Sequence, residues 1–167
     1  MRTPRPAEDN PTAERRQGSS DASDSRERGV ALVVVVDDLE RIVELHGPAG
    51  LTEVLGEAGR RIRQTLRSDD STMRWGGEEL VVILRDVSID GAVEVGQRIR
   101  IAVSQPLTFG DGRSMVPTCS VGCAAGNPED LEELVGRAKQ ALGSAKASGG
   151  NSLRRALAVE GNRTAGV

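Results

Sequence analysis

The chain has 167 residues and a formal net charge of −3, which favours one domain with tails and excludes the broad basic face of a non-specific nucleic-acid binder. Hydrophobic residues make up 37% and aromatic residues only 1%, so the core must be built from aliphatic side chains. No apolar run approaches the roughly 18 residues of a membrane-spanning helix. The first 28 residues also lack an apolar signal segment, so we expect no membrane association and a cytoplasmic protein.

The composition divides the chain into three parts. Residues 1–28 are rich in Arg, Asp, Glu, Ser and Pro and contain almost nothing to bury, so we expect a disordered tail. Residues 29–156 alternate between apolar runs and turn signals, as a folded domain does. Residues 157–167 form a short C-terminal tail.

The folded part begins with a strand and helices. The β-branched run Val30–Val36 predicts a central buried strand. A short helix should follow and be broken by Gly47-Pro48-Ala49-Gly50. Apolar residues then recur at helical spacing from Leu51 to Leu66, which predicts a second helix.

The middle of the chain predicts a hairpin. Strands over 71–75 and 80–84 flank Gly76-Gly77-Glu78-Glu79, and paired glycines suit a tight turn because both can take positive φ. A helix over 90–103 and a strand over 115–123 should follow.

The last third predicts a helix and an edge strand. Asn127-Pro128-Glu129-Asp130 indicates a helix start with Asn127 as the N-cap, and Gly149-Gly150 should end that helix. Residues 151–156 add an edge strand. The element order predicts an α+β fold with one mixed, mainly antiparallel sheet covered by helices, on the ferredoxin-like βαββαβ plan with additions.

Three residue types need separate comment. Cys119 and Cys123 form no CxxC pair, so we interpret them as buried apolar residues and expect neither a disulfide nor a zinc site. His46 lies in a turn with no partner motif, which favours a surface or packing role. Trp75 should pack under the hairpin.

Several motifs carry a family resemblance. The segment Arg74-Trp75-Gly76-Gly77-Glu78-Glu79-Leu80 resembles the R-Y-G-G-[DE]-E-F hairpin of the GGDEF family, the diguanylate cyclases. Ser120-Val121-Gly122 resembles the S-[IV]-G strand of the family. Residues 138–146 resemble its A-D-x-A-L-Y-x-A-K helix. The match covers about residues 30–155.

The resemblance implies a function for the hairpin. Family members join two GTP molecules across a dimer interface, and divalent cations, usually Mg²⁺, stabilise the leaving pyrophosphate. By this resemblance Gly76 and Gly77 let nucleotide phosphates approach, Glu78 is the metal ligand and Glu79 is the catalytic acid beside the reacting ends. Lys146 matches a phosphate-binding lysine. The alternative is a solvated turn with two exposed acids.

The rest of the expected site departs from the family pattern. Counting back from Gly47, the metal-binding Asp falls on Val35, the phosphate-binding Lys on Glu40 and the guanine-reading Asn on Val43. At further positions this chain also differs from the family. Thr52 stands where the family has a guanine-contacting Asp, and Gly150 stands where it has a phosphate-binding Arg. Lys139 and Gly143 stand where it has Asp and Tyr. Asp37 could replace the lost carboxylate only if the strand slipped or a water intervened, because it lies about 6.6 Å further along.

A second motif matches the inhibitory site of the family. Arg67-Ser68-Asp69-Asp70 has the RxxD spacing, and in the family its Arg and Asp bind an intercalated cyclic di-GMP dimer. Arg67 and Asp70 are therefore candidate cyclic di-GMP ligands. They could equally be an arginine at a helix end and an aspartate that caps a turn.

The favoured hypothesis is a GGDEF-family module with a degenerate catalytic site that binds cyclic di-GMP or regulates a partner. One alternative is an active diguanylate cyclase that uses GTP and Mg²⁺. Another is a protein-interaction domain that binds no nucleotide. A homodimer and a protein partner are both expected possibilities, whereas phosphodiesterase activity is not expected because the sequence has no EAL-type or HD-type metal cluster.

Overall fold

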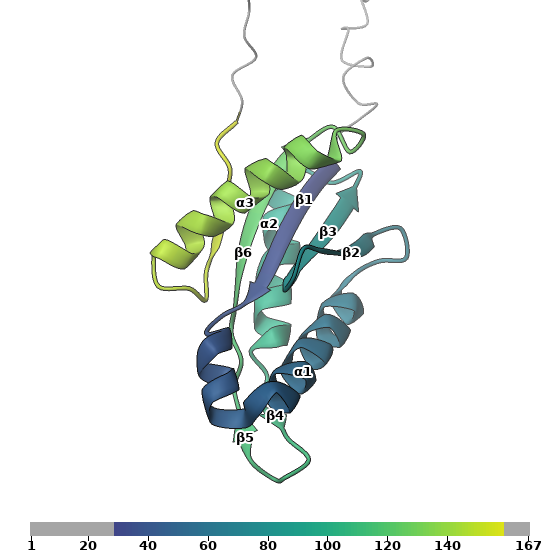
Figure 1. Cartoon of the computed structure of the whole chain (residues 1–167). Coiled ribbons are helices and arrows are strands. Elements are labelled where there is room, and N and C mark those ends of the chain that lie inside the picture. The colour runs from purple at the N-terminus through teal and green to yellow at the C-terminus, as the bar shows by residue number, and fades with distance from the viewer. Residues whose placement is uncertain (1–28, 159–167) are drawn as a thin grey trace, which may run out of the picture.

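The computed structural model describes residues 29–158, so the tails predicted over 1–28 and most of 157–167 lie outside the described residues. The described part forms a layered α+β domain (Figure 1). Its elements are β1 (Gly29–Val36), α1 (Leu39–Thr65), β2 (Ser71–Trp75), β3 (Glu79–Arg85), α2 (Ile89–Val103), β4 (Leu107–Thr108), β5 (Ser114–Met115), β6 (Cys119–Gly126), α3 (Leu131–Ala147) and β7 (Leu153–Arg155).

One five-stranded sheet organises the domain. Its strand order is β2-β3-β1-β6-β7, and all neighbours pair antiparallel except β6 and β7, which are parallel. The fully buried β1 lies at the centre, as its β-branched run predicts. The mixed, mainly antiparallel sheet is therefore confirmed, and β7 is the predicted edge strand.

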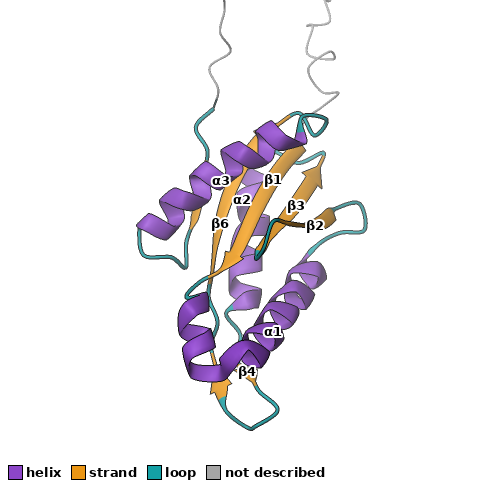
Figure 2. Ribbon diagram, viewed as in Figure 1, coloured by secondary structure: helices purple, strands orange, loops and turns teal. Residues whose placement is uncertain are grey.

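The helices cover the two faces of the sheet unequally. α1 and α2 pack on one face, whereas α3 crosses the other face (Figures 1 and 2). Side chains of β1 alternate between the two cores because successive residues of a strand point to opposite faces. Leu32, Val34 and Val36 face α1 and α2, and Val33 and Val35 face α3.

The close packing of α3 depends on a glycine of β6. A Cβ atom on Gly122 would lie 1.9 Å from the Ala138 carbonyl oxygen and 2.5 Å from the Leu142 nitrogen. No side chain fits at those distances, so the backbones of β6 and α3 approach directly. This packing gives a physical reason for the glycine in Ser120-Val121-Gly122.

Helix α1 is kinked at the predicted break. Gly47 has φ 71° and ψ 179°, and Pro48 follows it. The first part of α1 therefore points away from the sheet. It lies near the small β4–β5 hairpin, at the far end of the molecule in Figure 1. His46 stacks on Phe109 of that region with ring centroids 4.2 Å apart, so the packing role predicted for His46 is confirmed.

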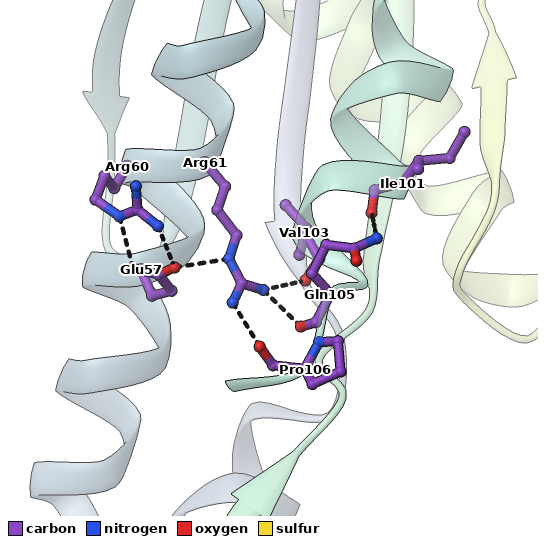
Figure 3. A network of polar contacts seen from close by, with 7 residues as sticks. All are labelled: Glu57, Arg60, Arg61, Ile101, Val103, Gln105 and Pro106. Atoms are coloured by element: carbon purple, nitrogen blue, oxygen red, sulfur yellow. Dashed lines mark hydrogen bonds and ion pairs between the residues drawn. The ribbon is translucent and has the colours of Figure 1, made fainter. Parts of the chain in front are cut away.

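An arginine joins the second part of α1 to the end of α2 (Figure 3). The Arg61 guanidinium donates to the backbone oxygens of Val103, Gln105 and Pro106 at 2.6–2.9 Å, and it is held from behind by Glu57 at 2.8 Å. These carbonyls belong to the last turn of α2 and the segment after it, where a helix leaves acceptors unpaired. Arg61 therefore clamps the two helices together.

Two local predictions are wrong. Helix α3 begins at Leu131 rather than near Pro128, because the Asn127 side chain accepts a hydrogen bond from the Glu129 backbone and forms a turn instead of a cap. The strand predicted over 115–123 is two strands, β5 and β6, and the β4–β5 hairpin was not expected.

The remaining structural expectations agree with the fold. Cys119 and Cys123 are free and buried on β6, and burial raises the pKa of each thiol to about 12. Trp75 packs at the edge of the core between the sheet and α3. Within residues 29–158, no helix combines the length and hydropathy that crossing a bilayer requires.

Candidate nucleotide site

The hairpin tip is an open turn of three residues. Trp75 pairs with Glu79, and Gly76, Gly77 and Glu78 connect them. Only Gly76 takes positive φ, at 63°, so the expectation that both glycines would do so holds for one. A Cβ atom on either glycine would meet nothing within 4 Å. The space above the turn is therefore accessible to a ligand.

A large groove lies beside this turn. Its volume is about 1110 Å³, and it is bordered by the end of β1, the first turns of α1, the hairpin tip and the end of α3. Glu78 and Lys146, two of the predicted site residues, both line it. The full lining is Val35, Val36, Asp37, Asp38, Leu39, Glu40, Arg41, Val43, Glu44, Leu51, Glu78, Lys146, Gly149 and Gly150.

The lining is more acidic than a phosphate site should be. It contains five carboxylates and two basic side chains, so ionised acids outnumber cations. Glu40 stands where the family resemblance places a lysine, and Val43 is a hydrocarbon where it places an asparagine. Val43 is 36% exposed and so contributes apolar surface to the groove. These side chains disfavour a polyanion here.

Thr52 and Gly150 also fail to replace the expected ligands. The Thr52 hydroxyl donates to the Pro48 carbonyl at 3.1 Å inside α1. Gly150 has φ 74°, and a Cβ atom there would lie 3.0 Å from the Asp37 carboxylate. An arginine at this position would require a strained backbone, so the glycine is a consequence of how the chain turns after α3.

Asp37 does not supply the missing metal ligand. Its carboxylate accepts hydrogen bonds from the Thr118 hydroxyl at 2.8 Å, the Ser120 hydroxyl at 2.6 Å and the Asn151 backbone at 2.8 Å. The side chain therefore fastens the end of β1 to β6 and to the turn before β7. Val35 is 6% exposed and packs against α3.

The second hairpin acid is paired with a base. Glu79 Oε2 lies 2.9 Å from Lys139 Nζ of α3. Glu79 does not line the large groove but a smaller cavity of about 220 Å³ between the second part of α1 and the hairpin. Glu78 lines this smaller cavity as well, so the two adjacent acids share it and only Glu78 also lines the large groove.

Taken together, the residues do not fit a bound Mg²⁺. This ion needs several hard oxygen ligands at about 2.0–2.1 Å. Over residues 29–158, no three His, Cys, Asp or Glu side chains come close enough to hold a metal. The expected pair of carboxylates is reduced to Glu78, because Val35 has no oxygen and Asp37 is already bound by three donors.

The second candidate site lies at the other end of β2. Arg67 and Asp70 form a tight turn, in which Asp70 Oδ2 accepts from the Arg67 backbone nitrogen at 2.9 Å. Asp70 thus caps the turn, which agrees with the structural alternative for that residue. The Arg67 side chain is exposed, and within the described part of the chain it has no ion-pair partner. The five residues of β2 separate this turn from the hairpin tip by roughly 16 Å.

Sequence reasoning missed the polar contacts that connect distant segments. Thr118, Ser120 and Asn151 hold Asp37 from 81 to 114 residues away, and Lys139 of α3 reaches Glu79 at the start of β3. One signal for the second contact was available. Lys139 departs from the resemblance motif at a position one residue after the buried Ala138.

Comparison with known proteins supports the resemblance. The sequence model of the family described as "Diguanylate cyclase, GGDEF domain" matches residues 13–152. The response regulator PleD of Caulobacter vibrioides is 37% identical over 127 residues, which are 74% of this chain and 28% of PleD. Diguanylate cyclase A of Treponema denticola is 33% identical over 122 residues, 72% of this chain and 33% of that protein. The chain thus spans about a quarter to a third of the length of these curated relatives.

Solved structures agree with the fold. The diguanylate cyclase SiaD of Pseudomonas aeruginosa, solved with its activator SiaC, superposes with a TM-score of 0.73 at 30% identity. This match covers 78% of the present chain and 50% of SiaD. The GGDEF domain of PA1120 (YfiN or TpbB) from the same organism gives a TM-score of 0.75 at 29% identity, over 83% of this chain and 88% of that domain.

Proposed function

Since the chain belongs to the GGDEF family of diguanylate cyclases and so to cyclic di-GMP signalling, we propose that it binds cyclic di-GMP without synthesising it. In this proposal Arg67 and Asp70 recognise the dinucleotide, and the hairpin site has lost turnover. The domain then acts as a receptor or as a regulatory module for a partner.

One observation carries the proposed loss of turnover. Neither Val35 nor Asp37 offers a free carboxylate to the hairpin, because Val35 is a hydrocarbon and Asp37 is bound by Thr118, Ser120 and Asn151. Phosphoryl transfer depends on positioning and charge neutralisation, and metal ions provide most of the latter. The acids around the groove add repulsion to this deficit.

The proposed binding role rests on the turn after α1. The Arg67 guanidinium is exposed and can pair bidentately with a phosphate or with guanine acceptors. Asp70 uses one carboxylate oxygen to hold the turn, which leaves the other oxygen to accept from a guanine edge. The turn therefore presents a donor and an acceptor on one short, capped loop.

Isothermal titration calorimetry with cyclic di-GMP tests the receptor role. We expect saturable binding to the wild-type chain and a loss of at least tenfold for Arg67→Ala, because a charge-assisted pair contributes about 1.5–3 kcal/mol. Arg154→Ala is the matched control, since Arg154 is exposed on β7 at the opposite edge of the sheet. Absence of binding to the wild-type chain would remove the receptor role and make a protein-interaction domain the best account.

An active cyclase is the second candidate. It is favoured by the placement of Glu78 and Lys146 on one groove and by the open space above Gly76 and Gly77. In that case the chain would work as a homodimer with GTP and Mg²⁺, as the family resemblance implies. A GTP turnover assay with Mg²⁺ separates this candidate from the receptor.

A protein partner is a further part of the proposal. SiaD, which is 30% identical to this chain, was solved with its activator SiaC. By analogy, a regulatory protein would supply the input or receive the output of this domain. Co-purification from the native host, with Arg67→Ala as the comparison, would show whether any such partner depends on the dinucleotide turn.

A further inference from the structure

The two adjacent acids of the hairpin need a positive charge to compensate them, and the side chains present cannot bind a divalent cation there. Glu78 and Glu79 are adjacent in sequence at the start of β3, and Glu79 is only 25% exposed. A partly buried carboxylate is costly unless a cation or several donors compensate it. Because Val35 provides no oxygen and Asp37 is already bound, a divalent cation would find too few ligands here.

A lysine ammonium of α3 provides a positive charge for Glu79. Lys139 Nζ lies 2.9 Å from Glu79 Oε2 and reaches it across the α3 face of the sheet. Val35 packs on that same face, in the cluster that includes Ala138 and Leu142 of α3. The ladder between β1 and β3 ends at Val34 and Leu80, so Val35 and Glu79 are the next residues on neighbouring strands. Val35, where the family resemblance places the metal-binding Asp, and Lys139 therefore both lie on the α3 face of the sheet beside Glu79.

We propose that the Lys139 ammonium takes the place of the divalent cation at this hairpin, so that the domain compensates its acids without metal. An ammonium is a compact point charge with three donors on a flexible stem, which suits one carboxylate but cannot bridge phosphates as a metal does. The hairpin then retains its shape and loses its affinity for a metal–triphosphate complex. The inference concerns the end of β2 opposite to Arg67, so it stands or falls independently of cyclic di-GMP binding.

Manganese titration of the full chain, followed by the electron paramagnetic resonance signal of free Mn²⁺, tests the proposal. We expect no saturable site in the wild-type chain. The variant that carries both Val35→Asp and Lys139→Met should gain a site at least roughly tenfold tighter than either single variant, because one change restores an oxygen ligand for an ion on Glu78 and the other removes the ammonium charge that repels a cation from the adjacent hairpin acids. The Lys139→Arg variant keeps the positive charge, so it should show no saturable Mn²⁺ site.

A double-mutant cycle of melting temperatures provides a second measurement, which does not require the Val35→Asp variant to fold. Lys139→Met should lower the melting temperature in the wild-type background and have a smaller effect when Glu79→Gln is also present, because the paired charge is then absent. Arg154→Ala is the control for loss of an exposed positive charge. Magnesium should leave the melting temperature of the wild-type chain unchanged.

Two results would overturn the proposal. One is saturable Mn²⁺ binding to the wild-type chain that disappears in Glu78→Gln. The other is a Lys139→Met effect on melting that is the same with and without Glu79→Gln, since Lys139 would then be an ordinary surface residue.

Discussion

At the scale of single residues, the Asp37 carboxylate has a structural role. Its two oxygens accept three hydrogen bonds, from Thr118 just before β6, from Ser120 of β6 and from the turn before β7. Asp37→Ala should therefore destabilise the fold by about 2–4 kcal/mol, because it leaves several partly buried donors without an acceptor. Chemical denaturation measures the change, and Glu40→Ala, an exposed acid on the same groove, should change stability by less than about 0.5 kcal/mol.

Gly122 makes a second prediction at this scale. Gly122→Ala places a methyl group against the backbone of α3, so we expect a loss of about 3 kcal/mol or failure to fold. Gly143→Ala is the matched control, because a Cβ atom there meets nothing within 4 Å on the exposed side of α3. That change should stabilise the chain by about 0.5–1 kcal/mol through helix propensity. Equal effects of the two substitutions in denaturant melts would contradict the close packing.

The sequence predicted the candidate site unevenly, and the reason lies in the range of the contacts. Gly76, Gly77 and Glu78 belong to one short motif, so their shared turn followed from local chemistry. The pairing of Glu79 with Lys139 depends on how α3 crosses the sheet, which no local pattern encodes. The sequence left open whether Asp37 could replace the lost ligand, because strand alternation specifies a face and not a hydrogen-bond partner.

At the scale of elements, Arg61 determines how α1 meets the end of α2. Arg61→Lys keeps the charge but loses the planar fork that reaches three carbonyls and Glu57, so we expect a loss of about 1–3 kcal/mol. Arg60→Lys is the matched control on the adjacent, more exposed arginine, and it should change stability by less than about 0.5 kcal/mol. A larger effect of the control in urea melts would contradict the role assigned to Arg61.

The same cluster predicts a pH dependence. Hydrogen bonds from Arg60 and then Arg61 lower the pKa of Glu57 from 4.5 to about 2. Because the pKa of Glu57 is lower in the folded chain, its carboxylate stabilises the fold at any pH above the pKa in the unfolded chain. This contribution is lost as the pH falls from about 4.5 to about 2. The wild-type chain should exceed Glu57→Gln in unfolding free energy at neutral pH, and the difference should shrink across that window. A difference independent of pH would show that the ion pairs contribute nothing.

Elements with strong periodicity were predicted well, and short elements were not. The buried β1, the kink at Gly47 and the hairpin of β2 and β3 follow from runs and turn residues. The two-residue strands β4 and β5 are too short to produce a pattern, and Phe109 in the loop between them packs on His46 of the distant α1. The predicted start of α3 was wrong because Asn127 can cap either a turn or a helix, and here its side chain accepts from the Glu129 backbone in a local turn.

At the scale of the whole molecule, the domain keeps the family scaffold around an altered groove. The two-sided core and the close approach of α3 to β6 depend on residues far from the groove, so the fold does not require the nucleotide ligands. The groove could therefore exchange a carboxylate for Val35 and a lysine for Glu40 without loss of the sheet. Most of the residues that form the two cores are therefore separate from the residues that line the groove.

Turnover of GTP tests the central claim most directly. The full chain would be incubated at high concentration with GTP and Mg²⁺, and cyclic di-GMP would be measured by chromatography. We expect no product above that of the Glu79→Ala variant, because neither Val35 nor Asp37 provides a free carboxylate and Lys139 holds the second hairpin acid. Cyclic di-GMP that accumulates with the wild-type chain and disappears with Glu79→Ala would contradict the account.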